Sequence, residues 1–171
     1  SLIVDPPDGR IPGLTAEAQG RARVRNQRPV TERVVLGSLA HGPEDVGLSE
    51  RCLLGFSSGP PIVPSEYNNI LQVLQTPDHV VIFTEMIHEA RVVPLDGRAH
   101  LPGDVSQWLG DSRGHWDGDT LVVDTTNFTN KVSFNGGLVG KGASGETFHL
   151  VERFTRVNAE TLLYEFTVED P

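Results

Sequence analysis

The chain has 171 residues, of which 37% are hydrophobic and 22% charged, so it is long enough for one globular domain with its own core. Its formal net charge of −9 disfavours nucleic acid as a partner, because phosphate binding depends on Lys and Arg. The single cysteine, Cys52, excludes an internal disulfide and a cysteine-based zinc cluster, and no apolar run approaches the roughly 20 residues of a membrane helix.

Residues 1–66 show little periodicity and are predicted to form an irregular arm around the rest of the domain. Residues 1–5 fit a short edge strand that the following Pro-Pro pair ends, and residues 15–25 fit a short helix with Thr15 as its N-cap. The alternative for the remainder of the arm is disorder. Wrapping is favoured because solvated linkers rarely carry apolar anchors such as Leu53, Leu54, Phe56, Ile62 and Val63.

From residue 67 to residue 171 the pattern changes to seven strand-like segments, rich in β-branched and aromatic residues and separated by turn residues. They cover residues 70–74, 80–85, 90–95, 114–116, 120–128, 148–157 and 161–169. Sequential strands joined by short turns favour antiparallel pairing, so we expect an all-β meander that forms one folding unit with the arm. Such a meander buries its apolar face by closing into a calycin-like barrel or by folding into a flattened sandwich, and the barrel is preferred.

Two longer loops interrupt this meander, at residues 96–112 and 130–147. The second is rich in glycine but lacks the Gly-Lys-Ser/Thr ending and the strand–loop–helix context of a phosphate-binding loop. It is therefore interpreted as a flexible flap.

Charged residues within the strands predict a polar interior. Glu85 lies on the apolar side of its strand, and Arg91 is its nearest cationic candidate. Glu152 and Arg153 point to opposite sides of theirs, so one of the two faces inward once the sheet closes. An enclosed charge implies either a buried ion-pair network or a polar ligand pocket.

Three segments gather side chains that are able to carry chemistry: residues 85–91, 96–100 and 111–116. His115 is the candidate general base, with Asp111 or Asp124 as its orienting partner, and in an alternative version Glu85 moves the proton. No Ser or Cys has the setting of a nucleophile, and no cofactor motif is visible. The predicted catalytic residues are His115, Glu85, Arg91, Asp111 and Arg113, and the predicted ligand-binding residues are Asp96, Arg98, His100, Trp108, Trp116, Glu152 and Tyr67.

Each of these segments also has a plain structural alternative. Residues 85–91 can hold a structural ion pair, residues 96–100 can be a solvated surface turn, and both tryptophans can fill the core. No cofactor is predicted. The minority alternative is a metal ion bound by His88, His100 and His115, although their separation gives no spacing signal.

Three long runs carry a family resemblance: QTPDHVVIFTEMIHEARVVPLDGRAHLP, QWLGDSRGHWDGDTLVVDTTNF and HLVERFTRVNAETLLYEFTVEDP. They resemble a large uncharacterised family of exported bacterial β-rich proteins, over about residues 60–171 and in the opening SLIVDPPDGRIPGLT. The resemblance implies a periplasmic or extracellular location and a chain that is part of a longer protein, but it implies no activity. Residues 130–147 depart from the family pattern.

The leading hypothesis is a protein that binds a small polar-aromatic molecule at the open end of the β structure, extended in one version to cofactor-free isomerase, lyase or hydrolase chemistry. The alternatives are a non-catalytic periplasmic or extracellular structural module and a His-ligated metalloenzyme. Neither a membrane nor a nucleic acid is expected as partner, and the open edge of the last strand predicts a homodimer.

Overall fold

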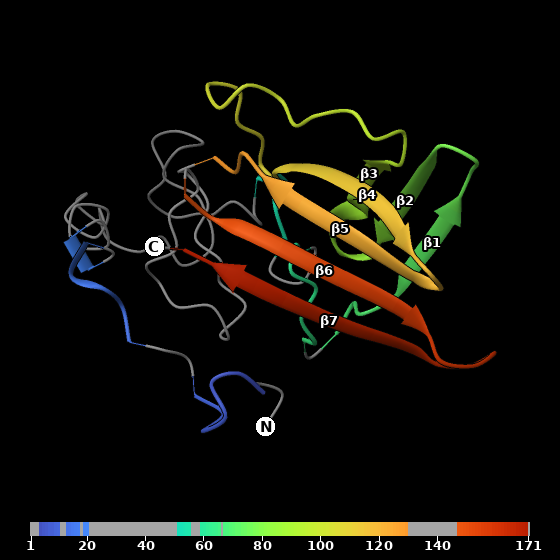
Figure 1. Cartoon of the computed structure of the whole chain (residues 1–171), viewed down its shortest axis with the longest axis horizontal. Helices are drawn as coiled ribbons and strands as arrows, with labels where there is room; N and C mark the ends of the chain where they lie inside the picture. The colour runs from blue at the N-terminus through green and yellow to red at the C-terminus, as the bar shows by residue number, and fades with distance from the viewer. Residues whose placement is uncertain are drawn as a thin grey trace.

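The computed structural model describes residues 4–10, 13–17, 19–20, 51–55, 59–65, 67–129 and 147–170. Within these ranges the chain forms seven β-strands in two antiparallel sheets (Figure 1). The first sheet has the order β1-β2-β3, with β1 (Leu71–Gln75), β2 (His79–Thr84) and β3 (Ala90–Pro94). The second has the order β4-β5-β6-β7, with β4 (Asp111–Asp117), β5 (Thr120–Thr126), β6 (His149–Arg156) and β7 (Leu162–Glu169).

The predicted strands are confirmed, with ends that agree to within three residues. Their period-two patterning is visible in β2 and β6, where alternate side chains are buried, as expected for strands with one face in a core. The β4–β5 turn contains Gly118 at φ 60°, a left-handed conformation that glycine adopts without a steric penalty. Every sheet neighbour is also a sequence neighbour, so the predicted meander is confirmed within each sheet.

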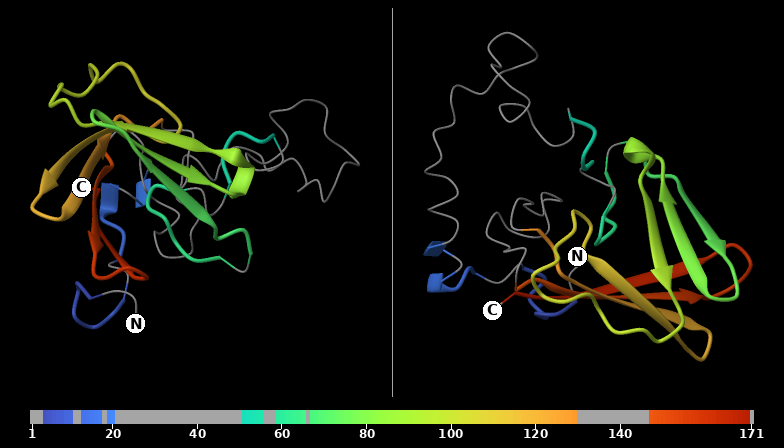
Figure 2. Two further views of the ribbon diagram at one scale, coloured as in Figure 1. Left: turned by 90° about the vertical axis from the view of Figure 1, so that its right-hand side faces the viewer. Right: turned by 90° about the horizontal axis from the view of Figure 1, so that it is seen from above.

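The described strands do not close into the preferred barrel. Their two sheets form two layers instead, as in the sandwich alternative, and the strands of the layers run in different directions (Figure 2). β7 is an edge strand of the second sheet as described, and the homodimer through this edge stays a prediction.

The main core lies between the two sheets. Residues Val80, Ile82 and Val93 of the first sheet pack against Leu121, Val123 and Phe154 of the second. Gly114 allows the sheets to approach closely, because a Cβ at this position would lie 2.8 Å from both Val93 Cγ1 and Leu95 Cδ2. A second cluster, formed by Phe128, Phe148 and Leu150, extends the core along the inner face of the second sheet.

Two residues of the described part of the arm contact the core, and wrapping by the whole arm stays a prediction. Val63 is buried, and Ile62 packs against the core between the sheets. Residues 16–17 and 19–20 are helical, which places the predicted helix start correctly, whereas residues 21–25 and Phe56 lie outside the described residues. Val4 and Asp5 are not part of a strand, and the other three residues of that prediction lie outside the described ranges.

Two further predictions bear on loops and membranes. Of the predicted Gly-rich flap at residues 130–147, only Thr147 belongs to the described residues. No helix in the described ranges has the length and apolar character needed to cross a bilayer.

Candidate functional site

The interior of the sandwich contains a buried ion pair between the two sheets. Arg91 of β3 donates to Glu152 of β6 through Nη1 and Nη2, at 2.5 and 3.1 Å from Oε2 and Oε1. The Tyr164 hydroxyl on β7 donates to Glu152 Oε1 at 2.8 Å and accepts the Ile62 N–H at 2.9 Å. Burial, together with the nearby charge of Glu152, raises the pKa of Tyr164 above its ordinary value of 10.0. The prediction of an enclosed charge is confirmed, in its ion-pair form.

Two details of that prediction are corrected. Glu85 does not point into the core: it is exposed, precedes the 3-10 turn Met86–His88, and accepts the Ile70 N–H through Oε2 at 3.3 Å. The buried face of β2 is that of Val80, Ile82 and Thr84, so the side of Val81 and Phe83, on which Glu85 would continue, is the outer one. Arg91 therefore pairs with Glu152 rather than with Glu85. Arg153, on the outer face of β6, pairs with Asp117.

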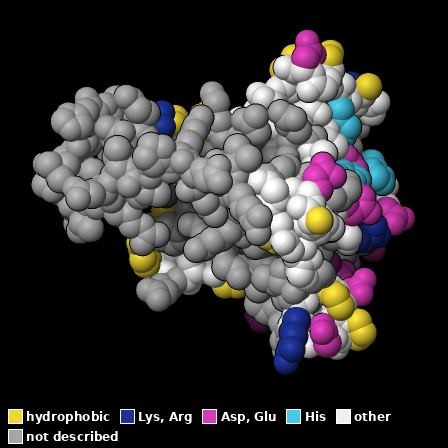
Figure 3. All heavy atoms as spheres, turned by 90° about the vertical axis from the view of Figure 1, so that its left-hand side faces the viewer, with side chains coloured by type: hydrophobic (Ala, Val, Ile, Leu, Met, Phe, Trp, Pro, Cys, Tyr) yellow, Lys and Arg dark blue, Asp and Glu magenta, His cyan; other side chains and the backbone are white. Residues whose placement is uncertain are grey.

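A second polar group lies on the outer face of the second sheet. It is a continuous chain of hydrogen bonds with two histidines placed between three carboxylates. His100 joins Asp111 and Asp124 through Nδ1 and Nε2, at 3.1 and 2.9 Å. His149 joins Asp124 and Glu169 through Nε2 and Nδ1, at 2.8 and 3.1 Å. We refer to these five residues as the outer-face network, and Figure 3 shows histidine and acidic side chains gathered on one side of the molecule.

The geometry of the outer-face network favours protonation of His149. An ionised carboxylate only accepts hydrogen bonds, so an imidazole between two carboxylates makes both contacts only when both ring nitrogens carry a proton. Hydrogen bonds to Asp124 and Glu169 accordingly raise the pKa of His149 above its ordinary value of 6.5. Arg113 adds a guanidinium to the network, with its Nη1 2.6 Å from Asp111 Oδ1.

This arrangement corrects the predicted role of Asp111 and Asp124. Both orient His100, not His115. Both ring nitrogens of each histidine of the outer-face network are engaged by carboxylates, so the network is a set of side-chain links rather than a ready general base. His115 is exposed on β4, and within the described residues its side chain makes no hydrogen bond.

The other predicted site residues are dispersed. Asp96 and Arg98 form an exposed local pair, with Arg98 Nε 2.8 Å from both carboxylate oxygens, and hydrogen bonds from Arg98 lower the pKa of Asp96 to about 2. Tyr67 is 56% exposed, which leaves it away from the core, and Trp108 is half-buried in the connection between β3 and β4. The single predicted pocket therefore separates into an interior pair, an outer-face network and a surface turn.

The metal alternative gains no support from the described part of the chain. There, no group of three or more His, Cys, Asp or Glu side chains is arranged to hold a metal ion. Of the three proposed ligands, His100 has both ring nitrogens engaged by carboxylates, and His88 and His115 are exposed.

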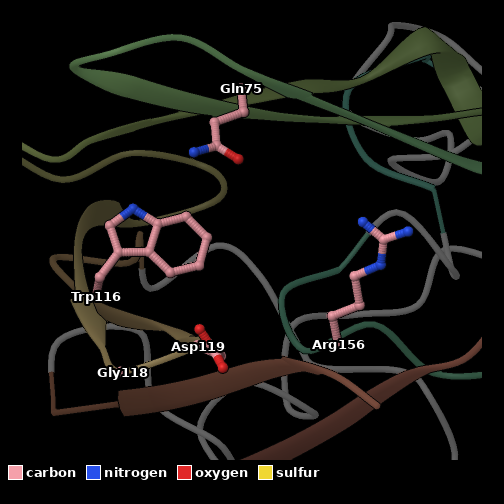
Figure 4. Close-up of a pocket in the computed structure, with 5 residues that line it drawn as sticks. All are labelled: Gln75, Trp116, Gly118, Asp119 and Arg156. Atoms are coloured by element: carbon pink, nitrogen blue, oxygen red, sulfur yellow. The ribbon is translucent and has the colours of Figure 1, made fainter. Parts of the chain in front are cut away.

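An open groove of about 450 Å³ lies at the end of the sandwich where the β4–β5 turn comes near the end of β1. Its side chains extend into the space that they surround (Figure 4). Trp116 is 46% exposed here, which leaves a large aromatic surface open to a ligand. The groove is lined by Gln75, Trp116, Gly118, Asp119 and Arg156.

The polar groups of this groove are available for binding. Arg156 donates through Nε to the Asn158 carbonyl at 3.3 Å, and its terminal nitrogens have no partner among the described residues. The side chains of Gln75, Trp116 and Asp119 likewise make no hydrogen bond within the described ranges. Four polar side chains thus meet at one opening without satisfying one another.

Sequence reasoning identified Trp116 but missed Gln75, Asp119 and Arg156, and it missed His149 and Glu169 of the outer-face network. Strand alternation contained a usable signal for two of these. Arg156 follows Glu152 and Phe154 at every second position of β6, so it shares their inward side. His149 lies at an odd position of the same strand, on the outward side with Arg153.

No protein-family model, no curated protein and no solved structure matches the chain. The resemblance to exported bacterial proteins therefore stays a prediction.

Proposed function

We propose that the protein binds a small planar anion, of the aromatic carboxylate class, in the groove at the open end of the sandwich. The observation that carries the proposal is the exposed indole of Trp116 in the same groove as Arg156, whose terminal nitrogens have no partner among the described residues. The periplasmic or extracellular location implied by the family resemblance belongs to the proposal, and fractionation of cells that express the full-length protein tests it.

The chemistry of the lining selects this ligand class. An indole face favours a planar ring, and a guanidinium forms two parallel hydrogen bonds with a carboxylate. Gln75 adds one donor and one acceptor, which suits a ring hydroxyl or amide. Asp119 repels a second negative charge, so a monoanion is favoured over a dianion.

The dimensions of the groove favour a small ligand and modest affinity. Sites for small molecules typically enclose about 300–1,000 Å³, and the groove's volume of about 450 Å³ falls toward the lower end of this range. The groove is open to solvent, so a ligand keeps part of its hydration and the polar contacts compete with water. A dissociation constant on the order of 0.1–1 mM is expected.

Binding is proposed rather than conversion because of where the titratable side chains lie. The groove lining contributes one carboxylate, Asp119, and one guanidinium, Arg156, which does not lose its proton in proteins. The two histidines of the outer-face network are each held by two carboxylates, and neither lines the groove.

Tryptophan fluorescence provides the test. In a Trp108→Phe background, Trp116 is the remaining tryptophan of the chain's two, so titration with benzoate and 4-hydroxybenzoate should change its emission saturably. Arg156→Gln should weaken binding roughly tenfold, as expected for the loss of one charge-assisted contact. Arg98→Gln is the matched control, because Arg98 is an exposed arginine outside the groove, and it should leave binding unchanged.

Neutral benzamide and inorganic phosphate separate the two parts of the recognition. Each should bind more weakly than benzoate, since one lacks the charge and the other the ring. If no aromatic acid changes the emission or the melting temperature at concentrations up to about ten times the expected dissociation constant, the proposal is wrong. The structural-module alternative then becomes the better account of the fold.

A further inference from the structure

We infer that the outer-face network is a pH-sensitive latch that holds the connection between the two sheets against the second sheet. The inference does not depend on the proposed ligand. The latch is at the start of β4, at Asp111, whereas the groove is at the end of the same strand, at Trp116.

The connection comprises residues 95–110 and crosses from β3 of the first sheet to β4 of the second (Figure 1). From residue 96 to residue 107 all side chains are exposed except that of His100, which is 28% exposed. Apolar burial therefore contributes little to the position of this segment, and polar contacts hold it.

These polar contacts fall into two groups. Some do not depend on a histidine: Asn127 Nδ2 donates to the carbonyls of Leu101, Pro102 and Val105 at 3.0 Å each, and Arg113 Nε donates to the Ala99 carbonyl at 3.0 Å. The others surround His100. Asp111 Oδ2 accepts both His100 Nδ1 and the Leu101 N–H, at 3.1 and 2.9 Å, and Asp124 on the next strand accepts His100 Nε2.

Loss of a proton from this arrangement weakens it. A neutral imidazole presents one lone pair, which would then face a carboxylate oxygen at hydrogen-bond distance and repel it. The two histidines are coupled because Asp124 receives one hydrogen bond from each, through different oxygens. When His149 is neutral, Asp124 loses one charge-assisted hydrogen bond, and this is the carboxylate that also holds His100.

The charged groups that face the histidines come from every neighbouring element. Asp111 and Arg113 come from β4, Asp124 from β5 and Glu169 from β7. Arg153 and Glu165 lie further along the same face, with Arg153 paired to Asp117. The two histidines themselves are contributed by the connection and by β6.

The sign of the pH effect follows from the direction of two shifts. The pKa of His149 is raised above 6.5 by its contacts with Asp124 and Glu169, so its contribution is complete below pH 6.5 and is lost as the pH rises through the raised value. Burial alone would raise the pKa of Asp111, but hydrogen bonds from Leu101, Arg113 and His100 outweigh it and lower the pKa below 3.8. The contribution of Asp111 is lost only in more acidic solution. The latch is therefore closed between about pH 4 and 6.5 and weakens above.

Amide hydrogen exchange, corrected for the intrinsic effect of pH, provides the experiment. The Leu101 amide donates to Asp111, so its protection factor reports the latch directly. We expect this factor to fall about tenfold from pH 5.5 to pH 8.5, as expected for the loss of one charge-assisted hydrogen bond, while the Val123 amide in the core stays constant.

Three variants separate the latch from general loosening. His149→Gln leaves His100 in place and should reduce the pH response of the Leu101 amide. In this variant Asp124 is in contact with one histidine instead of two. His115→Gln is the matched control: it removes an exposed histidine of the same face that makes no hydrogen bond among the described residues, and it should keep the full response. Asn127→Ala should lower the protection equally at both pH values, since its contacts do not titrate.

Equal Leu101 protection at pH 5.5 and 8.5 in the wild-type protein would overturn the inference. A response that persists unchanged in His149→Gln would overturn it as well. Neither outcome bears on ligand binding in the groove, which is measured separately by the fluorescence of Trp116.

Discussion

Arg91 and Glu152 face each other across the interior of the sandwich and share two hydrogen bonds, although 61 positions separate them in the sequence. Their side chains are 7% and 0% exposed, which removes both charges from solvent. One side chain belongs to each sheet, so the pair links the two layers in one relative position. Tyr164 completes the group by donating to the same carboxylate.

Removal of one partner should destabilise the protein strongly. Glu152→Gln leaves the Arg91 charge buried without its counter-ion, and we expect a loss of about 3–5 kcal/mol in the free energy of unfolding, measured by urea denaturation at neutral pH. The double variant Arg91→Met with Glu152→Leu should recover most of this loss, because apolar residues of similar size need no counter-ion. Asp117→Asn, which breaks the exposed pair with Arg153, is the control and should change stability by less than about 1 kcal/mol. If Glu152→Gln also lowered the free energy of unfolding by less than about 1 kcal/mol, the result would contradict the stabilising role of the buried pair.

Tyr164 should remain protonated well above the pH at which free tyrosine ionises. Its pKa is raised first by burial and then by the charge of Glu152, so folding favours the neutral phenol. The folded protein should accordingly lose stability as the pH rises above 10, where the unfolded chain ionises and the folded chain does not. The chain has two tyrosines, so an ultraviolet titration of Tyr67→Phe isolates Tyr164. Ionisation near pH 10 without unfolding would refute the prediction.

The hydroxyl of Tyr164 also makes a measurable contribution of its own. Tyr164→Phe removes a donor to Glu152 and an acceptor for the Ile62 N–H, which should cost about 1–3 kcal/mol. The comparison is Tyr67→Phe, at an exposed position, which should cost less than Tyr164→Phe in the same urea denaturation. Equal stability of the two variants would show that these hydrogen bonds do not contribute.

A side chain at position 114 should push the sheets apart. The Cβ of Gly114→Ala would lie 2.8 Å from Val93 Cγ1 and Leu95 Cδ2, and we expect a loss of about 1–3 kcal/mol from this overpacking. Gly103→Ala is the matched change, because its Cβ would meet no atom within 4 Å. It should be neutral or stabilising by up to about 1 kcal/mol through the unfolded chain. Thermal unfolding of these two variants provides the test. A Gly114→Ala variant as stable as wild type would mean that the two sheets are not in close contact at this position.

The exposed pair of Asp96 and Arg98 should affect the titration of the Asp96 carboxyl and leave the stability of the protein nearly unchanged. The pKa of Asp96 is lowered to about 2 by hydrogen bonds from Arg98, so nuclear magnetic resonance titration of the carboxyl should show a midpoint near that value. Arg98→Gln should return the midpoint toward the ordinary 3.8. The unfolding midpoint should change little, since both side chains are solvated. A midpoint that does not move would show that Arg98 is not the partner in solution.

The strands were predictable because their signals are local. Alternation of burial with period two and turn residues such as Asp117-Gly118 are properties of neighbouring positions, and both can be recognised without knowledge of the fold. For Glu152 and Arg153 the alternation predicted only that one of the two faces inward, and the structure shows that it is Glu152.

Contacts between distant segments were not predictable in this way. The barrel and the sandwich contain the same strands, and the choice between them rests on whether the edge strands of the two sheets hydrogen-bond to each other, for which the sequence has no local signal. The outer-face network was missed for a similar reason. Alternation puts Asp124 and His149 on the outer side of their strands, but it does not reveal that the connection folds back to bring His100 between Asp111 and Asp124.

The order of the strands has a consequence for how the molecule reaches this state. Within each sheet consecutive strands pair, and apart from β5 and β6 the hairpins close over turns of at most five residues, so strand pairing needs little loop closure. Contact between the layers instead unites positions 61 apart, as at Arg91 and Glu152. Hairpins should therefore assemble early and the layers should dock late. Substitutions at this ion pair should mainly accelerate unfolding and barely slow refolding, which stopped-flow kinetics of Glu152→Gln would reveal.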